Sequence, residues 1–232
     1  MSEGASPGVK EFTSILIVII LLTGIVTFHY MTTGQTFSYY FLLFNLILVA
    51  IVILVNVFAK KIAAFYYEAK IQHQIWVIGR YGFKKESHFN KPIPAGILVP
   101  FILSLLSYGY LMIMTLLEFD VYSTTARTSK MHGIHRFTEM TEIHIGLIAA
   151  AGVIASLLAA IVGYIAGFPE FSRLSIYYAC FSMIPLSNLD GAKIFFSGGQ
   201  LGSGTRIGGL PTLWVVLGLI CLVFLGYALL PY

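Results

Sequence analysis

The stretch CFSMIPLSNLDG, residues 180–191, takes an apolar segment directly into a carboxylate at Asp190, which is followed by Gly191. An ionisable group at membrane depth is costly, so it is usually paired or functional. The identity of the group that faces Asp190 is therefore informative. A metal ion, a lysine and a water-filled cavity would each imply a different function.

The composition indicates an all-α integral membrane protein. Of the 232 residues, 58% are hydrophobic and 10% are charged, whereas soluble domains carry about 25% charged residues. We expect one polytopic membrane domain, residues 1–232, embedded in a lipid bilayer, with no nucleic-acid partner. A spanning helix needs roughly 20 apolar residues. Six segments approach that length: residues 14–31, 39–58, 94–117, 145–167, 174–189 and 212–230.

The basic residues favour one topology. If residues 94–117 enter and leave the membrane on the same side, every Lys and Arg except Arg173 lies inside together with the N-terminus, as the positive-inside rule prefers. Pro100 and Gly109 interrupt this segment, which suits a re-entrant hairpin. The alternative is a kinked sixth span. We therefore predict five or six transmembrane segments.

Three polar regions connect the segments: an interfacial loop at 60–93, a polar loop at 118–143 and a glycine-rich connector at 197–210. Within the first, apolar residues recur at every second position over much of residues 70–83, which predicts a short β-strand or hairpin on the inner membrane surface. An exposed strand edge of this kind can bind extended peptides.

The fourth segment carries small residues at strict four-residue spacing. Such a stripe lines one helix face and lets transmembrane helices approach closely. We therefore place this helix at the centre of the bundle, beside the helix that leads to Asp190. The stripe consists of Ala151, Ala155, Ala159, Gly163 and Gly167.

Three motifs resemble, in order, those of the site-2 protease family of intramembrane zinc metalloproteases. The family's HExxH helix corresponds to NVFAKKIAA at residues 56–64, its AGPxxN helix to AGVIAS at 151–156, and its LDG motif to Leu189-Asp190-Gly191. The resemblance covers residues 40–195 and implies a protease-like membrane core. Residues 212–230, beyond this core, are the last predicted span.

The departures from these motifs imply a core without the protease chemistry. The family's first zinc-binding His falls on Asn56, its catalytic Glu on Val57 and its second His on Lys60. A catalytic zinc needs about three protein ligands, and only Asp190 remains. We therefore expect no catalytic residues, no metal and no cofactor.

The same alignment predicts an ion pair between Lys60 and Asp190, because both fall on zinc-ligand positions and the re-entrant topology brings them to similar depth. The alternative is that Lys60 extends to the lipid headgroups while Asp190 caps a helix or meets water. A rebuilt zinc site is a further alternative, with ligands from His132, His135, His144 and Asp190.

We expect a non-catalytic membrane protein that binds a transmembrane client or partner subunit, through the inner-surface strand and a groove beside the second and fifth spans. One alternative is a divergent zinc-dependent intramembrane metalloprotease. Another is a small transporter or channel that uses Asp190, although few intramembrane polar groups accompany it. The charge distribution suits a prokaryotic plasma membrane.

Overall fold

The computed structural model describes residues 7–80, 88–110, 112–114, 117–123, 142–186, 188–197 and 210–229. It is mostly helical (74%), as the composition predicted. The predicted polar loop beyond Ser123 and the glycine-rich connector beyond Ser197 lie outside these residues. Four described helices are long and apolar enough to cross a membrane. They are α1 (Pro7–Thr32), α2 (Tyr39–Tyr66), α5 (Glu142–Ile165) and α8 (Leu210–Ala228).

The predicted fifth segment is not one continuous helix. Helix α6 (Pro169–Ser182) begins earlier than expected and ends before Pro185, and a separate short helix, α7 (Asp190–Phe196), follows. Proline lacks a backbone N–H and disfavours helix in the residue before it, so it separates α6 from α7. At 1.5 Å per residue α6 is roughly 21 Å long, which is shorter than a bilayer core of about 30 Å.

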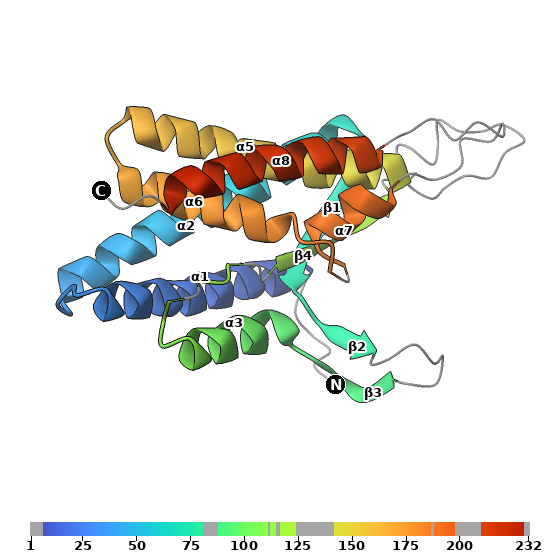
Figure 1. The fold of residues 1–232 in the computed structure, drawn as a ribbon. Coiled ribbons are helices and arrows are strands. Elements are labelled where there is room, and N and C mark those ends of the chain that lie inside the picture. The colour runs from blue at the N-terminus through green and yellow to red at the C-terminus, as the bar shows by residue number, and fades with distance from the viewer. Residues whose placement is uncertain are drawn as a thin grey trace, which may run out of the picture.

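The predicted third segment returns to the end of the bundle from which it starts. Helix α3 (Ala95–Leu106) runs beside α1, and the chain then comes back to strand β4 (Leu117–Ser123), which pairs antiparallel with β1 (Ala69–Ile75) (Figure 1). Because β1 directly follows α2, both ends of the segment lie beside the same helix end. Helix α3 is not among the four candidate spans, and the number of membrane spans stays a prediction.

Two features hold this hairpin against α1. The Nδ1 atom of His29 lies 2.6 Å from the carbonyl oxygen of Gly109. Gly109 has φ +80° and sits against Phe28, which a Cβ atom would approach to 3.0 Å. In the returning limb, Met112 and Met114 are buried among α1, α2 and α6. Non-helical backbone is tolerated at membrane depth when protein covers it in this way.

The predicted inner-surface strand is present but shorter and already paired. Ala69, Ile71 and His73 of β1 alternate as buried residues, as a period of two requires. The alternation stops at Val77, which is exposed, and a second small sheet of β2 (Ile78–Arg80) and β3 (His88–Ile93) follows. Strand β4 occupies one edge of β1, and α1 lies against the same strand.

Helix α5 lies at the centre of the bundle, in contact with α2, α6, α7 and α8. Its close-packed face differs from the predicted stripe. Of that stripe, Gly163 is buried, the three alanines are half-buried, and Gly167 lies exposed in the turn beyond the helix. The face is rotated because residue 152, rather than 151, meets α2. Its small buried residues are Gly146, Ala149, Ala150, Gly152, Ser156, Ala160 and Gly163.

Candidate functional site

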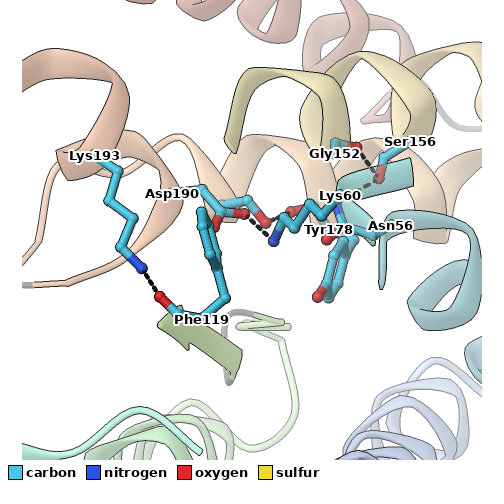
Figure 2. A network of polar contacts seen from close by, with 9 residues as sticks. Asn56, Lys60, Phe119, Gly152, Ser156, Tyr178, Asp190 and Lys193 are labelled. Carbon is cyan, nitrogen blue, oxygen red and sulfur yellow. Dashed lines mark hydrogen bonds and ion pairs between the residues drawn. The ribbon is translucent and has the colours of Figure 1, made fainter. Parts of the chain in front are cut away.

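The candidate site forms where α2, α5 and the start of α7 meet, although these segments are far apart in the sequence (Figure 2). Helix α2 contributes Asn56 and Lys60, which lie four residues apart and therefore share one helix face. Helix α5 contributes Gly152 and Ser156 at the same spacing. Asp190 is the first residue of α7. The three motif segments identified in the sequence thus converge on one buried centre.

Lys60 and Asp190 are in direct contact at this centre. The Nζ atom of Lys60 lies 2.6 Å from Oδ2 of Asp190, and the two side chains are 1% and 3% exposed. Removing two charges from water costs several kcal/mol per ion, which their attraction offsets only when the geometry is close. Exposed Phe65 and Tyr66 mark the end of α2, so Lys60 lies roughly 8 Å further into the bundle, at 1.5 Å per residue.

Two glycines create the space for this ion pair. A Cβ atom on Gly152 would lie 2.5 Å from Cε of Lys60. A Cβ atom on Gly191 would lie 2.1 Å from the carbonyl oxygen of Met183, so the glycine lets α7 start directly against the end of α6. Gly152 and Gly191 belong to two of the sequence motifs, and the close packing at this centre explains why each position holds a glycine.

A second polar contact joins α2 to α5 beside the ion pair. The Nδ2 atom of Asn56 donates to Oγ of Ser156 over 3.1 Å, and that hydroxyl donates to the carbonyl oxygen of Gly152 over 3.0 Å. Asn56 and Ser156 occupy two positions at which this chain departs from the family motifs. Here both serve as a hydrogen-bonded link between helices.

Phe119 and Lys193 complete the site, and sequence reasoning missed both. The ring of Phe119, which is fully buried, lies beneath two ammonium groups. Lys60 Nζ is 5.2 Å and Lys193 Nζ is 3.7 Å from its centroid. Lys193 also donates a hydrogen bond to the Phe119 carbonyl. In the sequence, Lys193 could have been found from its position three residues, or about one helical turn, after Asp190. Nothing in the sequence pointed to Phe119.

A carboxylate–histidine pair lies on the other edge of the sheet. Oε1 of Glu11 is 2.9 Å from both His73 Nδ1 and Lys61 Nζ. Because a carboxylate only accepts, Nδ1 carries the hydrogen. Burial lowers the pKa of His73 to about 4, with a further contribution from the charge of Lys60, and together these outweigh the attraction of Glu11. The imidazole is therefore neutral at neutral pH.

The residues at the centre do not fit the zinc ion that the resemblance would imply. Val57 is a buried apolar residue, and Lys60 brings a positive charge to a position where the family has a ligand. Within the described ranges no group of three His, Cys, Asp or Glu side chains gathers. Of the alternative ligands, His144 lies against Tyr67, with ring centroids 4.8 Å apart. His132 and His135 fall outside the described residues.

We predict that Asp190→Asn and Lys60→Met each lower the free energy of unfolding by about 3–5 kcal/mol, because either change leaves a buried charge without its partner. The double variant should recover part of the summed loss. Chemical unfolding in detergent would measure the cycle. Lys61→Met is the matched control, since Lys61 is 42% exposed, and it should cost about 1 kcal/mol or less. Strictly additive losses would contradict the pairing.

We also predict that His73 makes the fold sensitive to acid. Its pKa is about 4 in the folded chain and about 6.5 when unfolded. The unfolded state therefore takes up the proton first, and stability falls as the pH drops from 6.5 to 4, by at most about 3 kcal/mol. His73→Asn keeps a donor for Glu11 but cannot titrate. Unfolding free energies across this pH window should fall less for the variant, and parallel curves would refute the assignment.

Comparison of this chain with protein-family models, curated proteins and solved structures found no match. The resemblance to the site-2 protease family therefore rests on the three motifs themselves. The geometry adds that Asn56 and Lys60, Gly152 and Ser156, and Asp190 are neighbours in space.

Proposed function

We propose that this chain is a non-catalytic integral membrane protein with a site-2-protease-like core, and that it binds the transmembrane helix of a client or partner subunit. Its N-terminus and its sheet lie on the inner side of the membrane, because that orientation keeps nearly all basic residues inside. Besides the lipid bilayer, the proposed partner is the transmembrane helix of a client or partner subunit.

The buried ion pair of Lys60 and Asp190 is the observation that supports a non-catalytic core. Hydrolysis of a peptide bond needs an activated water and a base to accept its proton. At the centre of this core, the carboxylate of Asp190 is 2.6 Å from an ammonium group and 3% exposed. Val57, at the position of the family's catalytic Glu, packs in the apolar core.

The groove expected beside the second and fifth spans would lie between α2 and α6, whereas the larger groove lies between α6 and α8. Between α2 and α6 the chain fills the space itself, and a cavity of ≈10 Å³ remains among residues that include Val49, Met114 and Tyr178. Between the end of α6 and α8 an apolar groove of ≈330 Å³ remains, lined by Cys180, Pro185, Gly218 and Leu219 among others.

The groove between α6 and α8 suits a helix from another chain. Small residues along it let helix backbones approach, which is the main source of helix association in lipid. Gly218 provides this on α8, since a Cβ atom there would meet nothing within 4 Å. Val215 and Leu219 border the groove and are 49% and 59% exposed. A client helix would cover these side chains.

Photocross-linking from two adjacent valines tests the proposal. Val215 lines the groove and Val216 does not, yet they are 49% and 52% exposed. A photoreactive amino acid at position 215, in the native membrane, should give one protein adduct of defined mass, and the same group at 216 should give none. Equal adducts from both positions, or adducts with lipid alone, would contradict a client site in this groove.

Zinc analysis of the same purified chain separates this proposal from the protease alternative. We expect less than stoichiometric zinc, because the centre offers too few ligands. One zinc per chain that disappears in Asp190→Asn would identify a metalloprotease instead.

A further inference from the structure

The two cysteines of the chain meet between α6 and α8. Cys180 belongs to α6 and Cys221 to α8, 41 residues further along the chain. The thiol of Cys180 donates to the backbone carbonyl oxygen of Cys221 over 3.2 Å, and the two thiol groups are within hydrogen-bonding reach of each other. Both thiols are free. A disulfide requires two cysteines whose side chains face each other at close range, and this pair meets that condition.

Both cysteines line the apolar groove of ≈330 Å³ between α6 and α8. Cys221 is buried, whereas Cys180 is half-buried and connects the pair to the groove. Small-molecule sites occupy about 300–1,000 Å³, so the groove has room for one ring. Trp214 also lines it, and its indole N–H donates to the carbonyl oxygen of Met183 over 3.0 Å, which fixes the ring. A planar ligand can stack on such an aromatic side chain.

The pair lies at a depth that water-soluble oxidants do not reach. Helix α8 is one of the four helices long and apolar enough to span a membrane. At 1.5 Å per residue, Cys221 is roughly 16 Å from the start of α8 and about 10 Å from its end. Charged molecules are excluded from this depth by the cost of leaving water. An uncharged molecule dissolved in the lipid enters the groove from the side.

We propose that Cys180 and Cys221 form a redox-active dithiol, and that a lipid-soluble quinone in the groove oxidises it to a disulfide. Two S–H bonds break and one S–S bond forms. The quinone takes up the two electrons and the two protons on its carbonyl oxygens and leaves as the quinol. Dithiol, quinone, disulfide and quinol are all uncharged, so the net reaction leaves no charge to be stabilised in the apolar groove.

Oxidation joins α6 to α8 across the segment that carries α7. The closed loop contains Asp190, the first residue of α7, so the disulfide restrains the element that supplies the carboxylate of the buried ion pair. A disulfide also constrains the unfolded chain. The oxidised chain should therefore melt at a higher temperature than the reduced chain. A client helix in the same groove would cover Cys180, which makes this oxidation a property of the client-free protein.

Incubation with a quinone tests the proposal. The probe is a fully substituted benzoquinone with a short isoprenoid tail, added without oxygen to the reduced, full-length purified chain in lipid nanodiscs. Mass spectrometry after thiol alkylation should find a disulfide within each chain, and absorbance should find one quinol per chain. Cys180→Ser and Cys221→Ser should each yield no quinol. Thiols that stay free, disulfides between chains instead of within one, or quinol from either serine variant would overturn the proposal.

Two substitutions on α8 test whether the quinone acts from this groove. Gly218 lines the groove, and a Cβ atom there would meet nothing within 4 Å, so Gly218→Leu fills the space and leaves both thiols in place. Gly226→Leu is the matched control, because Gly226 has equally open surroundings and is not part of the groove lining. Quinol formation should slow at least about tenfold in Gly218→Leu only. Equal rates in the two variants would overturn the proposal.

Oxidised glutathione provides the comparison between a lipid-soluble and a water-soluble oxidant. Because it is charged, it should leave the dithiol reduced over the time in which the quinone oxidises it. Oxidation at the same rate by both would overturn the assignment of the quinone. The reaction needs no client, so its outcome is independent of the photocross-linking from Val215 that tests the client site.

Discussion

The buried contact between Lys60 and Asp190 is the interaction on which the rest of the structure depends. Two charges at membrane depth are acceptable when they neutralise each other, and this requires α2 and the start of α7 to meet at one point. Gly152 and Gly191 supply the space for that meeting. In the resemblance to the site-2 protease family, the ammonium of Lys60 stands where a metal ion would supply the positive charge.

Charged side chains also bind to the backbone at the edges of the sheet. Glu11 bonds to the backbone of His73 on one outer edge, and Lys193 bonds to the backbone of Phe119 on the other. Charged side chains thus cover both edges of a two-stranded sheet, whose open edges are otherwise prone to pair with other chains. The surroundings of the two edges differ, because α1 lies against β1, whereas a pocket borders β4.

The sequence predicted those features of the fold that depend on a single local property of the chain. Apolar length predicted the four long helices, and Gly109, with φ +80°, lies where the chain turns back after α3. Sequence reasoning failed where tertiary contacts decide. The four-residue spacing of small residues alone could not show that Gly152, rather than Ala151, faces α2, since both lie in a run of small residues. Phe119 and His73 belong to strands separated by a helix, and only their pairing places them beside Lys60 and Glu11.

Infrared spectroscopy of the Asp190 carboxyl group tests the central claim most directly. The claim requires Asp190 to be ionised at neutral pH, with Lys60 as its counter-ion. A difference spectrum between wild type and Asp190→Asn should contain carboxylate bands and no protonated C=O stretch, and Lys60→Met should gain that protonated band. A protonated carboxyl band in the wild type that disappears in Asp190→Asn would contradict the ion pair.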